Sequence, residues 1–214
     1  DIKPYSAGKV QYLKHQYVLE AEYLDEQLGI LIETLKTRGL YDDTMIIISS
    51  DHGQAFNEHR FMYHGNYLYD EIVRVPLIVK YPDGRKFKKR TGYQSLVSIQ
   101  AMIKSVIDGG DDSDLTTDFV FAEAFGNTEN IPKSHQHRID HIRKKYEKVR
   151  KSIYMNGHKL TVNGTDGRLE ELIKGSVELH VHDKRSRSER SKLLKTMMRF
   201  NNDNNFIIPV EEKK

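Results

Sequence analysis

Apolar side chains recur every three or four positions between residues 8 and 38, while most charged residues of this stretch fall on other faces. This spacing predicts a long amphipathic helix that buries one face. Gly39 follows directly and favours a helix end at that point. The predicted buried face consists of Tyr17, Ala21, Leu24, Leu28, Leu31 and Leu35.

Two short apolar runs follow the helix, at residues 45–48 and 75–79, and a long polar stretch separates them. Short apolar runs bounded by turn residues are typical of strands buried on both faces, as in a parallel sheet. In open α/β sheets, ligands bind just beyond the carboxyl ends of such strands. Asp51 and His52 stand at that place, and long loops in compact domains tend to be functional.

The middle of the chain predicts a helix over 95–108 and a strand over 118–124. From Arg150 onward, apolar residues alternate with polar ones, which is typical of half-buried strands. The dipeptide Asn156-Gly157 lies between two such runs and predicts a hairpin.

A strand over 169–173 continues this small antiparallel sheet, and a basic helix over 188–200 follows it. The resulting domain prediction has three parts. They are an α/β part at 1–126, a connecting segment at 127–149, and a small antiparallel β subdomain with a terminal helix at 150–214.

Composition narrows the functional classes. The 214 residues carry 34 Lys plus Arg against 31 Asp plus Glu, a net charge of +3, which argues against a dedicated nucleic-acid binder. No run approaches 18 apolar residues, so we expect no membrane span in this chain. The absence of Cys excludes a disulfide framework and leaves the compartment open. The chain begins with Asp1 and shows no signal peptide, so it is expected to be a piece of something longer or a processed product.

The tripeptide Asp51-His52-Gly53 is the strongest candidate for chemistry. A carboxylate and an imidazole are both good ligands for a divalent cation, and glycine lets the backbone turn sharply or approach a ligand closely. A turn in which Asp51 acts as a cap explains the tripeptide alone equally well. Two further histidines, His59 and His64, fall in the same polar stretch and favour a functional site.

Several motifs in fixed order give the chain a resemblance to the sulfatase family of the alkaline phosphatase superfamily. The resemblance covers residues 5–82 closely and extends more loosely to about residue 173. It is carried by Tyr23-Leu24-Asp25, Leu28-Gly29, Ser50-Asp51-His52-Gly53, Glu58-His59, His64-Gly65, Leu68-Tyr69-Asp70-Glu71 and Arg74-Val75-Pro76-Leu77-Ile78-Val79. It implies a partial alkaline-phosphatase-like mixed sheet flanked by helices, with a small antiparallel sheet plus helix at the C-terminal end.

The same resemblance implies a role for each residue of the site. Asp51 and His52 match the family's ligands to one divalent metal ion. Calcium is the ion expected for a sulfatase, and magnesium, manganese or zinc also fit one carboxylate plus one imidazole. His64 matches a residue that contacts the ester oxygens of the substrate, and when protonated it could neutralise charge or protonate the leaving oxygen. His59 matches a residue at the rim of the substrate site. Glu123 matches a position whose role is structural.

Sulfatases carry their nucleophile in a Cys- or Ser-x-Pro-x-Arg motif, and this chain has none. The resemblance therefore implies a sulfuric ester hydrolase whose nucleophile and remaining metal ligands lie in a missing N-terminal half, so the chain alone is expected to be inactive. A phosphoglycerol or phosphoethanolamine transferase or a phosphodiesterase of the same superfamily is the second interpretation. A truncated, non-catalytic binding domain is the third.

The remaining histidines carry weaker signals. His137 and His141 are spaced i, i+4 and could form a metal pair if they share a helix face. His135 lies beside them, and all three stand among Lys and Arg, so solvent exposure is the stronger interpretation. His180 and His182 alternate with apolar residues and are expected on an exposed strand face.

Overall fold

A computed structural model describes residues 5–84, 92–110, 117–126, 148–164, 168–174, 177–179 and 186–203. Contacts divide the chain into two compact units. The first comprises residues 1–64 and 69–86, and the second comprises residues 65–68 and 87–214. The expected histidine pair His137 and His141, together with His135, His180 and His182, lies outside the described residues. The domain boundaries expected from the sequence stay a prediction.

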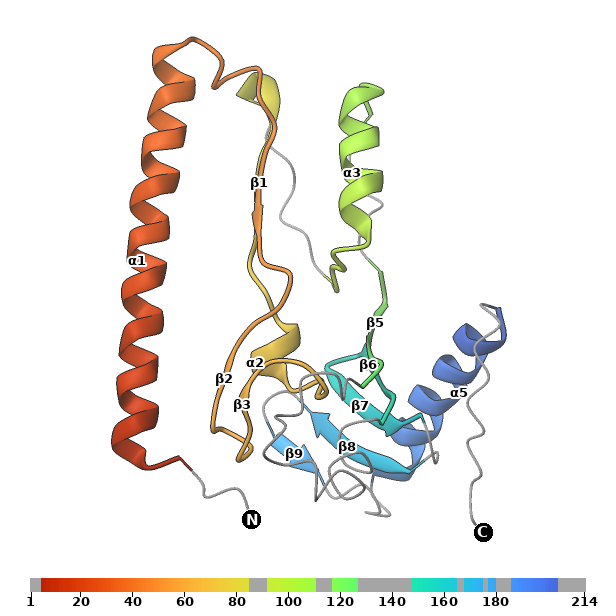
Figure 1. Ribbon diagram of the computed structural model, residues 1–214. Helices are drawn as coiled ribbons and strands as arrows, with labels where there is room; N and C mark the ends of the chain where they lie inside the picture. Colours follow the sequence, from red (N-terminus) through yellow and green to blue (C-terminus); the bar gives the residue numbers. More distant parts are fainter. Residues whose placement is uncertain are drawn as a thin grey trace. The chain divides into compact units, whose positions relative to one another are not determined.

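The first unit begins with the long helix α1 (Ala7–Thr37), close to the predicted bounds (Figure 1). The Ser6 side chain accepts a hydrogen bond from the Lys9 backbone N–H, which caps the first turn. At the other end, Gly39 adopts a φ of 66°, a conformation that favours glycine and ends helices. The sequence therefore predicted this helix and its end correctly.

The predicted burial of one face of α1 is wrong for the described residues. Tyr17, Leu24 and Leu31 are 51%, 58% and 52% exposed, and no residue of α1 is buried. Leu28 and Leu35 are half-buried. The amphipathic pattern identifies an apolar face, but no element in the described part of the chain covers that face.

The two apolar runs form strands β1 (Ile46–Ser49) and β4 (Leu77–Lys80), and these pair with each other antiparallel. This corrects the expectation of strands buried on both faces of a parallel sheet, because both strands are half-buried and Ile78 is 59% exposed. The physical reason lies in the segment that connects β1 to β4. The chain between them reverses direction and returns without a crossover, so the strands must run in opposite senses.

The connection between β1 and β4 is also more ordered than a plain loop. It contains a small hairpin made of β2 (Ala55–Phe56) and β3 (Met62–Tyr63), and then the single-turn helix α2 (Asp70–Val73). A one-turn 3₁₀ segment at Pro82–Gly84 follows β4. The candidate site is built on this connection.

The second unit contains α3 (Ser98–Ile107) and a five-stranded antiparallel sheet in the order β5-β6-β7-β8-β9. The strands are β5 (Phe119–Ala124), β6 (Arg150–Met155), β7 (His158–Asn163), β8 (Leu169–Lys174) and β9 (Val177–Leu179). Asn156 and Gly157 connect β6 to β7 with φ values of 53° and 73°, as a tight hairpin turn requires. The predicted hairpin is thus confirmed.

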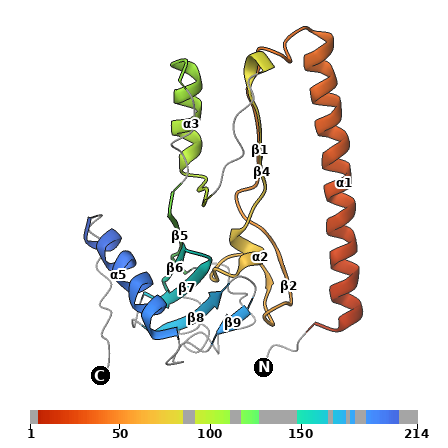
Figure 2. The ribbon, with the colours of Figure 1, turned by 180° about the vertical axis from the view of Figure 1, so that it is seen from behind.

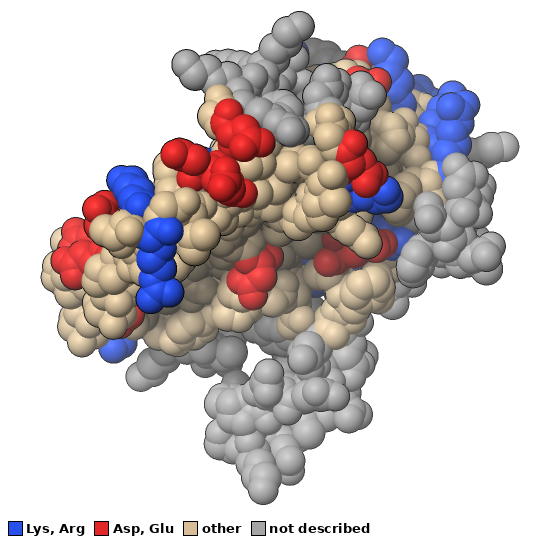
Figure 3. Space-filling model, turned by 90° about the horizontal axis from the view of Figure 1, so that it is seen from above, with Lys and Arg blue, Asp and Glu red and all other residues tan. Residues whose placement is uncertain are grey.

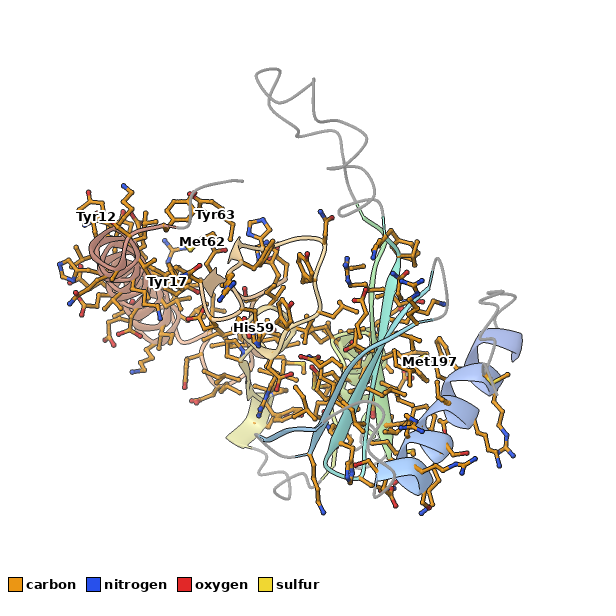
Figure 4. The ribbon with its side chains drawn as sticks, turned by 90° about the horizontal axis from the view of Figure 1, so that it is seen from below. Tyr12, Tyr17, His59, Met62, Tyr63 and Met197 are labelled. Atoms are coloured by element: carbon orange, nitrogen blue, oxygen red, sulfur yellow. The ribbon has the colours of Figure 1, made fainter. Side chains whose placement is uncertain are left out.

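One face of this sheet packs against α5 (Arg187–Asp203) (Figure 2), and together they form an apolar core. Met197 points from α5 toward the sheet in Figure 4. The core residues are almost completely buried: Ile153, Leu160, Val162, Leu172, Leu193, Leu194 and Met197. On the same face as Ile153, Lys151 forms an ion pair with Glu123 at 2.6 Å, and the structural role expected for that glutamate stays a prediction.

The opposite face of the sheet is polar and buried. Ser152 Oγ lies 2.7 Å from Thr161 Oγ1, and Thr161 Oγ1 donates a hydrogen bond to Glu171 Oε2 at 3.0 Å. Lys159 Nζ forms an ion pair with the same Glu171 oxygen at 2.7 Å. These contacts cross β6, β7 and β8, so they link three strands through side chains as well as through the backbone.

The charged side chains on the surface agree with the small net charge of the sequence. On the face drawn in Figure 3, basic and acidic side chains of the described residues are interspersed with uncharged ones. None of the helices in the described ranges combines the length and the apolarity that crossing a membrane demands.

Candidate active-site loop

Asp51, His52 and Gly53 follow directly after β1, and the backbone N–H of His52 donates to Asp51 Oδ1 at 2.9 Å. This contact turns the carboxylate toward its own neighbour, and Asp51 Oδ2 lies 3.7 Å from His52 Nε2. The Asp51 side chain is 85% exposed, so its oxygens are open to a ligand from outside.

Gly53 is the point at which this turn meets α2. Its backbone N–H donates to the carbonyl of Ile72 at 2.7 Å. A Cβ at this position would overlap the carbonyl oxygen of Glu71, because the two backbones pass too close for any side chain. The close approach therefore requires glycine and fixes Asp51 and His52 against α2.

His64 lies beside His52. The two imidazole rings are stacked with centroids 3.8 Å apart and an interplanar angle of 26°. On its other side, His64 Nδ1 lies 3.0 Å from Gln54 Oε1. His64, twelve positions after His52, thus comes into direct contact with one of the two metal-ligand candidates.

His59 makes a different set of contacts. Its Nδ1 lies 2.8 Å from Glu71 Oε1, and its ring stacks on Tyr69 with centroids 3.9 Å apart and an interplanar angle of 7°. Because Glu71 and Tyr69 lie in and directly before α2, His59 connects the β2–β3 turn to this helix. Its expected place at the rim of a substrate site stays a prediction.

The β2–β3 hairpin also contacts the first turns of α1 and the residue Tyr5 just before this helix. Lys14 Nζ forms an ion pair with Glu58 Oε1 at 2.9 Å, and Tyr17 packs edge-on against Phe56 with ring centroids 5.3 Å apart. Tyr5 Oη lies 3.3 Å from Tyr63 Oη, and this hydrogen bond, together with partial burial, raises the pKa of Tyr5. Figure 4 shows Met62 and Tyr63 beside this end of the helix.

The described residues contain no group of three or more His, Cys, Asp or Glu side chains arranged to hold a metal ion. They do contain two suitable donor atoms. His52 Nδ1 lies 2.9 Å from the carbonyl oxygen of Gly53, and a carbonyl can only accept, so Nδ1 is the donor in this contact and the lone pair of the neutral ring is on Nε2. Metal-binding histidines are commonly oriented in this way by a backbone carbonyl.

The separation of these donors also fits one cation. Bonds to zinc measure about 2.1 Å and bonds to calcium about 2.4 Å, so two ligand atoms on one ion lie at most about 4 to 5 Å apart. Asp51 Oδ2 and His52 Nε2 are 3.7 Å apart. The residues present therefore fit part of a divalent-metal site, and the other ligands would have to come from outside the described residues.

Comparison with known proteins identifies the family. The profile described as Sulfatase matches residues 4–108. These residues belong to the sulfatase family. The chain is 35% identical over 65 residues to the uncharacterized sulfatase YidJ of Escherichia coli, a match that covers 30% of this chain and 13% of that protein. It is 33% identical over 78 residues to an N-acetylglucosamine-6-O-sulfatase of Bacteroides thetaiotaomicron, covering 36% of this chain and 14% of that protein.

Solved structures extend the likeness in fold beyond the sulfatase segment. A phosphonate monoester hydrolase from Silicibacter pomeroyi superposes with a TM-score of 0.72 at 19% identity, covering 98% of this chain and 44% of that one. BT4656 in complex with its substrate D-glucosamine-2-N,6-O-disulfate superposes with a TM-score of 0.65 at 16% identity, covering 99% and 45%. The expected alkaline-phosphatase-like fold is thus confirmed, and the chain spans less than half the length of these two proteins.

Within this sulfatase segment, sequence reasoning missed Gln54 and Glu71, which contact His64 and His59 respectively. Glu71 belongs to one of the motifs that carry the resemblance, but no signal in the sequence connected it to His59. Gln54 stands directly after Asp51-His52-Gly53, and this adjacency was the one available signal.

Proposed function

We propose that the chain is part of a metal-dependent hydrolase of sulfate esters, in which Asp51 and His52 bind a divalent cation and His64 contacts the transferred group. The observation that carries this proposal is the stack of His64 on His52 with ring centroids 3.8 Å apart. This contact brings a second imidazole ring next to His52, one of the two candidate metal donors.

The roles follow from the chemistry of the side chains. A bound divalent ion would supply Lewis acidity toward the ester oxygens. Asp51 would offer a charged oxygen and His52 the lone pair of Nε2, whose direction is fixed by the Nδ1 contact to Gly53. When protonated on both ring nitrogens, His64 would donate a hydrogen bond from Nε2 to the anionic group and could deliver a proton to the leaving oxygen. We propose calcium as the ion, as for a sulfatase.

The nucleophile and the remaining metal ligands would come from an N-terminal half outside this chain. We therefore expect the purified 214-residue chain to show no turnover of an aryl sulfate such as 4-nitrophenyl sulfate. Sustained release of 4-nitrophenol that disappears in the Asp51→Asn variant would contradict this expectation, because it would place a complete site within the chain.

The metal site itself can be tested without activity. Manganese(II) is paramagnetic and broadens the NMR signals of nuclei close to it, even when it binds weakly. We expect Mn²⁺ titration to broaden the ring signals of His52 and His64 first, and excess Ca²⁺ to restore them. Asp51→Asn should remove the selective broadening, whereas Asp25→Asn on α1 should leave it unchanged. Uniform broadening of all exposed carboxylates would mean that Asp51 and His52 form no site.

A second candidate is hydrolysis or transfer of a phosphorus ester. It is favoured by the likeness to phosphonate monoester hydrolases and by 32% identity over 74 residues to a multifunctional alkaline phosphatase superfamily protein of Trinickia caryophylli. The two candidates differ in the charge of the group that His64 would contact. Rates on matched 4-nitrophenyl sulfate, phosphate and phenylphosphonate esters, measured on the chain joined to its upstream region, would separate them.

A further inference from the structure

We infer that Gln54 is a positioning residue for His64, which fixes the hydrogen of the imidazole on Nδ1 and leaves Nε2 to face the ligand. Gln54 Oε1 lies 3.0 Å from His64 Nδ1. An amide oxygen can only accept a hydrogen bond, so the hydrogen of this contact belongs to Nδ1. The two ring nitrogens point to different sides of the ring, so Nε2 is directed away from Gln54.

The contact follows from the register of the hairpin. Ala55 pairs with Tyr63 and Phe56 pairs with Met62, so Gln54 and His64 are the next cross-strand neighbours beyond this ladder. Directly opposed residues of an antiparallel pair have side chains close enough to interact. The β2–β3 hairpin therefore brings Gln54 to His64 through the backbone, independently of any ligand.

The backbone beside His64 supports a positioning role. Tyr63 adopts a φ of 71°, a left-handed conformation that is unusual for an aromatic residue, and Gly65 has a φ of 122°. Strain of this kind persists where surrounding contacts determine the conformation, and it often occurs at functional sites. Here it lies directly before His64, whose ring is held between Gln54 and His52.

Gln54 controls which ring nitrogen of neutral His64 carries the hydrogen. A hydrogen bond between neutral groups favours the bonded form by about two- to tenfold in population. With Nδ1 bonded to Gln54, Nε2 is the ring nitrogen that is left for the role of contacting a ligand. That last role rests on the proposed function, whereas the position of the hydrogen does not.

The test is long-range ¹H–¹⁵N NMR of the imidazole nitrogens in the ¹⁵N-labelled chain, which distinguishes Nδ1–H from Nε2–H. His64→Gln identifies the His64 signals by their disappearance. We expect Nδ1–H to dominate at His64 in the wild type. Gln54→Met, similar in shape but without the acceptor, should shift the population about two- to tenfold toward Nε2–H. Gln54→Glu should retain Nδ1–H because an oxygen acceptor remains in place.

Two controls separate this effect from a loss of structure. His52 Nδ1 contacts the carbonyl of Gly53 and should keep its own Nδ1–H form in every Gln54 variant. Gln27→Met, on the exposed surface of α1, should leave His64 unchanged. The inference is overturned if wild-type His64 carries its hydrogen on Nε2, or if Gln54→Met leaves the population as it was. Absence of metal or sulfate binding would count against the proposed function alone, because the tautomer is measured without either.

Discussion

The two units of the chain differ in how they use their apolar residues. In the second unit, the sheet and α5 cover each other, and Ile153, Leu160 and Leu172 are fully buried. In the first unit, α1 carries a comparable set of apolar residues, yet Leu24 and Leu31 remain more than half exposed. Burial of apolar surface is the main favourable term in folding, so stability is concentrated in the sheet that closes its own core.

The candidate site lies in the unit whose apolar surface is open. Asp51, His52 and His64 are held by short contacts of the backbone and of polar side chains. Among the described residues, the core cluster of buried apolar side chains includes none from the first unit. The closed apolar core and the candidate site therefore lie in different units of the chain. Matched substitutions in the two units test whether the two units differ in their contribution to the free energy of unfolding.

The largest expected effect comes from the buried ion pair of the second unit. Glu171→Ala removes the carboxylate that Lys159 Nζ contacts at 2.7 Å, and the lysine side chain is only 2% exposed. Removal of one partner of a buried pair costs about 3–5 kcal/mol in the free energy of unfolding. Urea denaturation followed by circular dichroism measures this loss.

The first unit offers the matched control. Glu33→Ala breaks a pair with Lys36 in which both side chains are more than half exposed, and we expect a change below about 0.5 kcal/mol. Equal effects of Glu171→Ala and Glu33→Ala would show that the two units do not differ in this respect.

A second pair compares leucines. Leu160→Ala removes a fully buried side chain from the sheet core and should cost about 2–5 kcal/mol. Leu31→Ala on α1 alters a side chain that is 52% exposed and should change stability by less than about 0.5 kcal/mol. The same denaturation measurement applies. A large loss for Leu31→Ala would mean that its face of the helix is covered in solution, for example by a second copy of the chain.

Much of the fold could be predicted because it depends on local periodicity. The helix expected over 8–38 is observed at Ala7–Thr37, and the Asn156-Gly157 hairpin forms as expected. The strand that pairs with each predicted strand, and the element that covers each predicted helix face, were harder to predict. A run of apolar residues does not determine whether its strand pairs parallel or antiparallel. An amphipathic pattern likewise does not determine which element covers the apolar face. The errors at β1, β4 and α1 have this common cause.

In the candidate site too, some residues could be selected from the sequence, whereas their neighbours could not. Asp51, His52 and His64 were selected by residue type and by resemblance, and their proposed roles stay predictions, although His64 does lie against His52. The contacts of Gln54 and Glu71 depend on the register of strands only two residues long. Such short strands leave no periodic signal, so these neighbours could not be predicted from the sequence.

Gly53 provides a test within the first unit. Gly53→Ala places a Cβ against the carbonyl of Glu71, so the turn or α2 must shift. Overpacking of this kind costs about 1–3 kcal/mol, and here we expect the loss to be local. The measurement is the NMR contact between the His52 and His64 rings together with the melting temperature. Gly29→Ala on α1, where a Cβ meets open space, is the control and should stabilise slightly if it has any effect.

The smallest expected effect is the pH dependence of the contact between α1 and the hairpin. Burial alone would raise the pKa of Glu58, but hydrogen bonds from Lys14 Nζ and from the Phe56 backbone N–H outweigh it and lower the pKa below its ordinary value. A carboxylate with a lowered folded-state pKa contributes stability above its unfolded pKa of about 4.3, and this contribution is lost as the pH falls through the folded value.

Because solvent screens this partly exposed pair, we expect its contribution at neutral pH to stay below about 1 kcal/mol. The difference in unfolding free energy between wild type and Glu58→Gln, measured from pH 3 to pH 7, should be largest at neutral pH and shrink on acidification. Lys14→Met should reduce the same difference, since the ion pair needs both partners. A difference that stays constant with pH would mean that packing of Tyr17 on Phe56, rather than the charge of Glu58, holds the hairpin to α1.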